Sequence, residues 1–356
     1  MKRPIPYGHQ WIEEDDIQAV VQVLKSDWLT QGPAVVKFEK AVAAYCGAKY
    51  AVAVSSGTAA LHAACKLSCR PVPVFCDIQS STLTIDPKEI EKKITRKTKA
   101  IIPVDFRGCP ADLGEIMRIA KKHKLLVIED ASHSIGSEYR GKKVGSIADM
   151  TVFSFHPVKT ITTGEGGMVM TNSKDLYEKI RMFRHHGVEK KPEKGGWYYE
   201  IQDPGYNYRI TDMQCALGLS QLKKIKKFIQ RRAQIVREYD RAFKDMQGLH
   251  IFPDQPKEKH AHHLYVMKVL PHEAKATRKQ IFDALKQEGI GVQVHYMPLH
   301  LHPFYKKKFG YKQGNFPVAE AYYQEAITLP LFPRMTKEDV RRVIAAVAKV
   351  ITRYRA

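Results

Sequence analysis

Lys159 has the surroundings that most directly suggest chemistry. It lies in FSFHPVKTITTGEGG (153–167), after an apolar, strand-like run and at the start of a glycine-rich turn. Open α/β sheets bind their ligands at the carboxyl ends of their strands, and the sequence places this lysine at such an end. A lysine amine held there can form a Schiff base with a carbonyl compound. By itself the signal is weak, because most lysines beside glycine-rich turns are only solvated.

Three other polar groups follow predicted strands. Asp130, in VIEDASHS (127–134), offers a carboxylate for a ribose, a metal or a protonated ring nitrogen, although helix capping would explain it equally well. SSGTAALHAA (55–64) starts a helix whose backbone N–H groups, with the Thr58 hydroxyl, suit a phosphate, and a plain cap is the ordinary alternative. Ser154 adds a hydroxyl on the strand before the lysine. Together they predict an anion site, a carboxylate and an amine at one edge of a sheet.

Alternating strand-like and helix-like segments position these groups. The predicted strands are 51–55, 72–78, 100–106, 125–131, 150–155 and 168–172, and the predicted helices between them include 57–67, 112–124 and 175–187. Such alternation, with strands that lack a polar face, predicts a parallel sheet covered by helices on both sides.

A second region follows a long predicted helix at 211–245. It reads as the strand HLYVMKVL, the helix RKQIFDALKQEG, the strand GVQVHY and the helix KEDVRRVIAAVAKVI. We therefore predict a large domain over 1–245, which includes an N-terminal arm, and a small α/β domain over 246–356.

Composition limits the class of protein. Hydrophobic residues make up 44% of the 356 residues, enough for a real core. No apolar run approaches the length of a membrane span, and the N-terminal residues lack the apolar core of a secretory signal, so we expect a cytoplasmic protein without a membrane partner. The net charge of +21 favours an anionic partner. Because aromatic residues do not interleave with the basic clusters, a small-molecule anion is favoured over nucleic acid.

Cysteines and histidines give no metal motif in the sequence. The six cysteines are Cys46, Cys65, Cys69, Cys76, Cys109 and Cys215. None forms a C-x-x-C pair or has matched histidines at zinc-ligand spacing, so buried reduced thiols are predicted. The histidines at 295, 300 and 302 could pass for a metal cluster, but ordinary polar side chains at the protein surface are the better explanation.

Long segments of the chain resemble the DegT/StrS family of sugar aminotransferases. They are SDWLTQGPAVVKFEKAVAAYCGAKYAVAVSSGTAALH, VIEDASHSIGSEYRGKKVG, FSFHPVKTITTGEGGMVMTN, GYNYRITDMQCALGLSQL and VHYMPLHLHPFY. The resemblance covers nearly the whole chain in collinear order. It implies the fold-type-I aminotransferase architecture, with a mostly parallel, seven-stranded type of sheet in the large domain. It also implies pyridoxal 5′-phosphate as cofactor, no metal, and a homodimer with a shared active site.

Within that family, SDWLTQGP, VDFRGCPAD, FHPVKTITTGEGG and QVHYMPLH most resemble the enzymes of pseudaminic acid synthesis. The resemblance implies transamination of a UDP-linked 4-keto-6-deoxy N-acetyl hexosulose, with L-glutamate as the amino donor. Two alternatives stay open. The substrate could be another 3- or 4-keto nucleotide sugar, or the protein could be a regulatory relative that has lost turnover. A sister group that dehydrates sugars has histidine in place of the lysine, and Lys159 weighs against that reading.

The resemblance also implies roles for individual residues. Lys159 would form the Schiff base with the cofactor, and Asp130 would hold the proton on its ring nitrogen. The other cofactor-binding residues would be His133 beside the ring, Gly57, Thr58 and Ser154 at the phosphate, and Asn207 at the phosphate of the neighbouring subunit. The residues lining the sugar-nucleotide site would be Tyr7, Trp28, Leu29, Thr30, Ser56, His295 and Tyr296.

The chain departs from the family pattern at one place. Family members have a further strand and helix after GTAALH, whereas here AACKLSC (63–69) runs almost directly into RPVPVFCDI (70–78). That β-α unit normally supplies the aromatic ring that stacks on the cofactor, a contact worth about 0.5–1.5 kcal/mol beyond burial. Three explanations remain: a segment not represented in this sequence, a deletion that the fold tolerates, or a poorly active relative.

Overall fold

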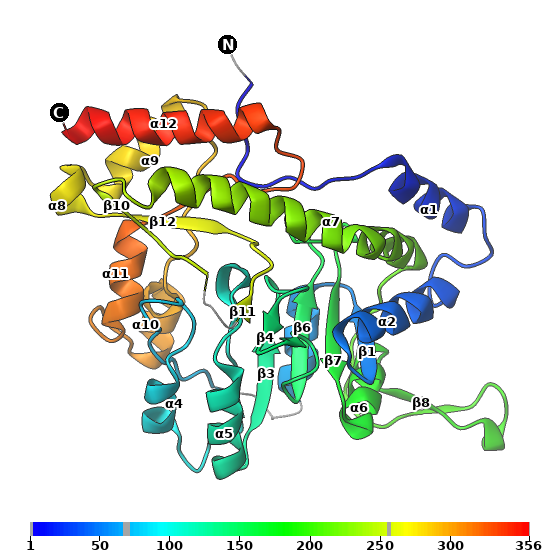
Figure 1. The fold of residues 1–356 in the computed structure, drawn as a ribbon. Coiled ribbons are helices and arrows are strands. Elements are labelled where there is room, and N and C mark those ends of the chain that lie inside the picture. Colours follow the sequence, from blue (N-terminus) through cyan, green and yellow to red (C-terminus); the bar gives the residue numbers. More distant parts are fainter. Residues whose placement is uncertain (1–2, 67–71, 255–257, 356) are drawn as a thin grey trace.

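A five-stranded sheet lies at the centre of the N-terminal part of the chain, in the order β1-β7-β6-β3-β2 (Figure 1). The computed structural model describes residues 3–66, 72–254 and 258–355. The strands are β1 (Tyr50–Val54), β7 (Gly167–Thr171), β6 (Met150–Ser154), β3 (Leu126–Asp130) and β2 (Ala100–Ile101). β6, β3 and β2 are mutually parallel, and β7 is antiparallel to both β6 and β1. Four strands therefore run in one direction and β7 alone in the other, so the sheet is mixed.

Two predicted strands of this sheet are shorter or absent. The predicted strand 72–78 forms no ladder, and its Val72 and Val74 side chains are 67% and 61% exposed. Only five residues separate the end of α3 from this segment, too few for the strand and helix that would join it to the sheet. The predicted strand 100–106 stops at Ile101 because Pro103 has no N–H to donate, although the pairing with β3 resumes at Val104.

Helices cover both faces of the sheet, as predicted. Those of the large part are α1 (Glu14–Leu24), α2 (Pro33–Cys46), α3 (Gly57–Lys66), α4 (Pro87–Lys93), α5 (Leu113–His123), α6 (Lys174–Arg184) and α7 (Asp212–Phe243). Successive residues of a strand point to opposite faces. Ala51 and Ala53 of β1 accordingly pack with α2 and α7, whereas Val52 and Val54 pack with α3 and α6.

The C-terminal part is built on a separate antiparallel sheet. Its strands are β10 (Leu249–Ile251), β12 (Tyr265–Val269) and β13 (Ala326–Leu329), and its helices are α8 (Pro271–Ala274), α9 (Arg278–Gln287), α10 (Pro303–Phe309), α11 (Pro317–Glu325) and α12 (Lys337–Arg355). The predicted strand GVQVHY forms only a bridge, between Gln293 and Thr328.

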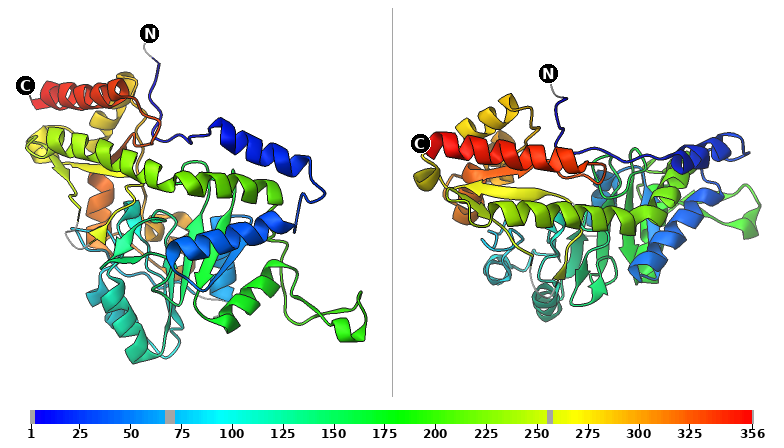
Figure 2. Two further views of the ribbon diagram at one scale, coloured as in Figure 1. Left: turned by 45° about the vertical axis from the view of Figure 1, so that its right-hand side comes forward. Right: turned by 45° about the horizontal axis from the view of Figure 1, so that its top comes forward.

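One helix joins the two parts. α7 contributes Phe228 to the core beneath the central sheet and Tyr239 and Phe243 to the C-terminal core. Both views of Figure 2 show α7 running along the two parts, with α12 beside its C-terminal half. The long helix predicted at 211–245 is therefore found, and it belongs to both cores.

Smaller elements complete the fold. The strands β11 (Glu258–Lys259), β4 (Glu138–Tyr139) and β5 (Lys142–Lys143) form a small sheet, β8 (Val188–Lys190) and β9 (Tyr199–Ile201) form a hairpin, and the 3-10 turns are η1 (Phe106–Gly108), η2 (Pro192–Lys194) and η3 (Leu299–Leu301). The hairpin projects from the body of the molecule in every view (Figures 1 and 2). None of the described helices is long and apolar enough to cross a membrane.

The cysteine prediction is largely confirmed. Cys46, Cys109 and Cys215 are buried, and Cys65 and Cys76 are half-buried. Cys69 lies outside the described residues.

Candidate active site

Lys159 lies in the loop between β6 and β7, just beyond the carboxyl end of β6. Its backbone N–H donates to His156 O at 2.9 Å, and the Thr163 N–H closes the loop on Phe155 O at 3.0 Å. Burial lowers the pKa of the lysine amine to about 8, against an opposing effect of the Asp130 charge. Among the residues that the structure describes, Nζ forms no hydrogen bond or ion pair. An amine that loses its proton near pH 8 can act both as a nucleophile and as a base.

Asp130 ends β3, the parallel neighbour of β6, and pairs in register with Val152. Its Oδ1 accepts hydrogen bonds from the Ser132 N–H at 3.1 Å and the Ser132 hydroxyl at 2.6 Å. These bonds belong to a local turn, so Asp130 caps no helix. The carboxylate is close enough to raise the pKa of the Lys159 amine. The structure thus brings these two predicted residues together at adjacent strand ends.

The N-terminus of α3 lies beside the end of β6. Ser56 caps this helix, because its Oγ accepts a backbone N–H of the first turn at 3.1 Å. A Cβ on Gly57 would lie 2.8 Å from Ser154 Cβ, and a Cβ on Gly167 would lie 2.3 Å from Ser56 O. The two glycines therefore allow the helix N-terminus to approach β6 and β7 closely. Thr58 is exposed on this first turn, and such an N-terminus attracts anions.

Three buried histidines surround the amine. Burial, followed by the positive charge of Lys159, lowers the pKa of His133 well below its usual value and that of His295 to about 4. Burial also lowers the pKa of His263, whose ring lies 4.3 Å from that of His133. His133 Nδ1 is buried and has no hydrogen-bond partner among the described residues. Sequence reasoning missed His263, because it lies far from His133 along the chain and no local pattern links them.

Two tyrosines lie beside the histidines. The Tyr7 ring is 5.6 Å from that of His295, and the Tyr296 ring is 4.7 Å from it. Tyr7 reaches this place because the N-terminal arm pairs with the C-terminal part at Ile5 and Ile290. Both predicted substrate-site tyrosines therefore lie at the edge of the lysine site.

Two further acids are buried behind Asp130. Asp105 accepts a hydrogen bond from the Ser134 hydroxyl at 2.6 Å, and Glu129 accepts one from the Thr151 hydroxyl at 2.7 Å. Burial raises the pKa of Asp105 to about 7 and that of Glu129 well above its usual value. We therefore expect Glu129 to keep its proton at neutral pH. Neither acid was predicted to belong to the site. Glu129 precedes Asp130 on β3, so its side chain faces the opposite side of the sheet.

Four of the predicted site residues lie on other elements of the structure: Trp28, Leu29, Thr30 and Asn207. The first three follow α1, where Thr30 pairs with Thr211 ahead of α7, and Trp28 and Leu29 are exposed. Asn207 is exposed and pairs with His185 at the base of the β8–β9 hairpin. No hydrogen bond or ring contact among the described residues joins these four to Lys159. Their predicted roles in the site therefore stay predictions, and that of Asn207 involves a second subunit.

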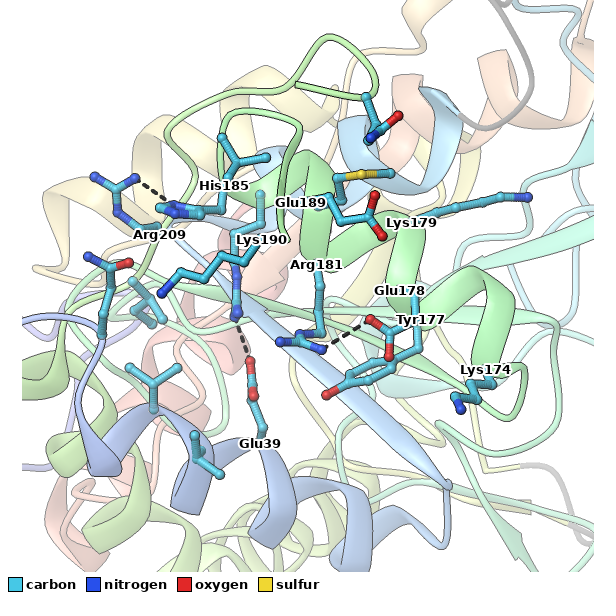
Figure 3. Close-up of a pocket in the computed structure, with 18 of the residues that line it drawn as sticks. Glu39, Lys174, Tyr177, Glu178, Lys179, Arg181, His185, Glu189, Lys190 and Arg209 are labelled. Atoms are coloured by element: carbon cyan, nitrogen blue, oxygen red, sulfur yellow. Dashed lines mark hydrogen bonds and ion pairs between the residues drawn. The ribbon is translucent and has the colours of Figure 1, made fainter. Parts of the chain in front are cut away.

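A cavity of about 910 Å³ lies between α2, α6 and the β8–β9 hairpin (Figure 3). The ion pairs Glu39–Arg184, at 2.6 Å, and Glu178–Arg181, at 3.0 Å, lie within it. Neither Lys159 nor Asp130 lines this cavity, so it is separate from the candidate active site.

Known proteins match the chain over nearly its whole length. The DegT/DnrJ/EryC1/StrS aminotransferase family matches residues 10–69 and 63–348. The uncharacterized protein MJ1066 of Methanocaldococcus jannaschii is 43% identical over 381 positions, covering 99% of this chain and 98% of that protein. The spore coat polysaccharide biosynthesis protein SpsC of Bacillus subtilis is 41% identical, covering 98% and 97%. A UDP-4-amino-4,6-dideoxy-N-acetyl-β-L-altrosamine transaminase of Campylobacter jejuni is 37% identical, covering 95% of each chain.

Solved structures share the fold. Helicobacter pylori PseC, an aminotransferase involved in the biosynthesis of pseudaminic acid, superposes with a TM-score of 0.93 at 34% identity, covering 99% of this chain and 100% of PseC. Spr1654 of Streptococcus pneumoniae, described as a sugar aminotransferase and solved with pyridoxal phosphate, gives 0.92 at 30% identity, covering 99% of each chain. The predicted fold-type-I architecture is therefore confirmed. The expected special nearness to the pseudaminic acid enzymes is only partly supported, because MJ1066 and SpsC are more similar in sequence.

The comparisons also bear on the missing β-α unit. The two matched stretches of the family meet at residues 63–69, where the sequence indicates the break. The alignment with MJ1066 has 381 positions and this chain has 356 residues, so at least 25 positions have no counterpart here. Both findings support a segment that relatives possess and this chain lacks.

Pyridoxal phosphate is the cofactor of these enzymes, and the residues present fit it. The buried amine of Lys159 suits its carbonyl, the Asp130 carboxylate suits its ring nitrogen, and the N-terminus of α3 with Ser154 suits its phosphate. The unpartnered Nδ1 of His133 is a polar atom that a ring substituent would satisfy. The agreement between this arrangement and the match along the chain leads to one conclusion: the protein belongs to the DegT/DnrJ/EryC1/StrS family of aminotransferases.

Proposed function

We propose that the protein transfers the amino group of L-glutamate to the 4-keto carbon of a UDP-linked 6-deoxy N-acetyl hexosulose. The product would serve a surface, spore or flagellar glycan. The observation that carries the proposal is the buried Lys159 amine, with a pKa of about 8, close enough to Asp130 at the ends of adjacent strands to be affected by its charge. The activity of the Campylobacter jejuni relative supports the substrate class, and the net charge of +21 suits a diphosphate-bearing sugar.

The residues of the chain would have the following roles. When bound, pyridoxal phosphate supplies a carbonyl carbon that takes up the amine and a ring that withdraws electrons. Asp130 would hold the proton on the ring nitrogen, and Ser132 keeps its carboxylate oriented through two hydrogen bonds. Lys159 Nζ would remove the proton from Cα of glutamate and, in the second half of the cycle, deliver a proton to C4 of the sugar. The neutral histidines leave Lys159 as the basic amine at the site.

The test is an assay of the purified protein with pyridoxal phosphate, L-glutamate and a panel of 3- and 4-keto nucleotide sugars, with mass spectrometry of the products. We expect glutamate to bleach the cofactor absorbance and an amino sugar to appear with the UDP-linked 4-keto substrate. Lys159→Ala and Lys159→Arg should lower kcat by about 10²–10⁴-fold or more. Lys142→Ala, at an exposed lysine of the small sheet, should keep full activity. A Lys159→Ala variant that turns over normally would refute the assignment.

The same assay separates the remaining alternatives. An amino product from a different 3- or 4-keto sugar would keep the aminotransferase mechanism and change only the substrate. A deoxy sugar without nitrogen would indicate dehydration. Absence of the cofactor absorbance, or its indifference to glutamate, would favour a regulatory relative that has lost turnover, which the missing β-α unit makes a concrete alternative.

A further inference from the structure

A cluster of potential metal ligands lies outside the lysine site. Cys109 follows η1 in the large part of the chain, and Glu258 and His260 lie on and just after β11. The thiol, one carboxylate oxygen and one ring nitrogen all lie within 4.8 Å of one another. Cys109 is fully buried and the His260 side chain is 1% exposed, whereas the Glu258 side chain is 14% exposed. The cluster is therefore largely interior, and Glu258 is the most exposed of its three residues.

Two of the three separations within the cluster match a tetrahedral zinc ion, and the third is below 4.8 Å. Cys109 Sγ and His260 Nε2 each lie 3.5 Å from Glu258 Oε2. Zinc binds sulfur at about 2.3 Å and nitrogen or oxygen at about 2.0–2.2 Å, so a tetrahedron requires ligand separations of about 3.4–3.6 Å. The donor set of thiolate, imidazole and carboxylate is also one that zinc accepts.

His260 is oriented as a metal ligand would be. Its Nδ1 lies 2.9 Å from Asp254 Oδ1, a carboxylate contact of the kind that fixes the tautomer of metal-binding histidines. That contact leaves Nε2 directed at Glu258 and Cys109. Although buried, Nε2 has no hydrogen-bond partner among the described residues, since 3.5 Å is too long for a well-formed bond. A second grouping, of Asp254, His260 and His262, is less suitable because it would break the Nδ1 hydrogen bond.

The backbone holds the two sides of the cluster in place. The Ala261 N–H donates to Ser137 Oγ at 3.0 Å, and Ser137 Oγ donates to Gly108 O at 2.8 Å. The His263 N–H donates to Arg107 O at 3.0 Å. These bonds fix the residues adjacent to Cys109 and His260, so the ligand positions exist before any ion arrives.

We propose that Cys109, Glu258 and His260 bind one Zn²⁺, with water as the fourth ligand and Asp254 supporting His260. The ion would fasten the loop after β2 to the segment that leads into the C-terminal part. Because His263 follows that segment and lies against His133, the ion would also steady one wall of the lysine site. This binding does not depend on the substrate proposed above.

The experiment measures metal binding directly. The holoenzyme is dialysed against a chelator and titrated with Co²⁺, whose tetrahedral ligand-field bands and thiolate charge-transfer band report the ligands. We expect one Co²⁺ per chain with a thiolate band, displaced by Zn²⁺, and a rise in Tm on Zn²⁺ addition. Cys109→Ser should lose the thiolate band and the Tm shift. Asp254→Ala should weaken Zn²⁺ binding by about 10–100-fold while leaving the thiolate band in place.

Matched variants keep the result interpretable. Glu258→Gln changes a partly exposed side chain, so it tests a ligand even if Cys109→Ser does not fold. We expect this variant to lose about tenfold or more of its affinity for Zn²⁺, as metal-site variants typically do. Cys76→Ser, at a half-buried thiol, and His272→Gln, at an exposed histidine, should bind Co²⁺ as the wild type does. No Co²⁺ uptake by the wild type, uptake without a thiolate band, or equal uptake by Cys109→Ser would each overturn the proposal. In the first case His260 would simply be protonated between two carboxylates.

Discussion

Lys159 shows how burial alone can prepare a reactive amine. Burial lowers the folded-state pKa of the amine from 10.5 to about 8, and Asp130 only partly opposes the effect. The folded chain therefore binds fewer protons than the unfolded chain between these two pH values. Stability consequently rises as the pH increases through that window, and below it the full cost of burying a charge is present.

Replacing this lysine by an apolar residue of similar length should therefore stabilise the cofactor-free protein. We expect Lys159→Met to raise the free energy of unfolding by about 3 kcal/mol at pH 7, the equivalent of the lowered pKa. The gain should shrink as the pH rises toward about 10, where the wild-type amine has lost its charge. Urea unfolding of both cofactor-free proteins at the two pH values measures the difference. Lys142→Met, at an exposed position, is the control, and a destabilised Lys159→Met would contradict the argument.

Among the elements, the contact of α3 with β6 and β7 matters most for the site. The helix N-terminus can lie against the sheet because Gly57 and Gly167 have no side chains to separate them. A methyl group on Gly167 would lie 2.3 Å from Ser56 O, a distance that requires the backbone to move. The position of the proposed phosphate site is therefore set by a packing constraint as well as by helix polarity.

Gly167→Ala should push the start of α3 away from the sheet. We expect a loss of about 1–3 kcal/mol in the free energy of unfolding, typical of overpacking, and weaker retention of pyridoxal phosphate. Denaturant unfolding and cofactor titration by absorbance measure the two effects. Gly196→Ala is a matched control, because a Cβ there meets nothing within 4 Å. Unchanged cofactor affinity in a folded Gly167→Ala protein would show that this contact does not position the phosphate site.

At the scale of the whole molecule, the exposed Asn207 and the projecting β8–β9 hairpin bear on the predicted dimer. If Asn207 serves the site of a partner subunit, Lys159→Ala and Asn207→Ala fall in the same site of a mixed dimer and leave the other site intact. Subunits exchanged between the two inactive proteins should then recover about a quarter of wild-type activity, since half the dimers are mixed and each has one intact site. Mass spectrometry under native conditions would verify the exchange. No recovery in verified mixed dimers would place Asn207 in the site of its own chain.

Much of the architecture followed from local patterns. Apolar runs alternating with helix-like segments predicted β1, β3, β6, β7, α3, α5, α6 and α7. The same patterns placed Lys159 and Asp130 at strand ends, because the periodicity of a strand is a local property. The segment 72–78 carries an equally good strand pattern, yet it forms no ladder, since a strand needs a neighbour and none is available there.

The sequence by itself determined the strand ends, the lysine and the carboxylate, and through its resemblance the family. Only the tertiary structure decided that His263 lies against His133, that Asp105 and Glu129 are buried together, and that Cys109 meets Glu258 and His260. These groupings join residues far apart in the chain, where no spacing rule operates. Their proximity results from how whole elements pack, and burial then changes the chemistry of each side chain.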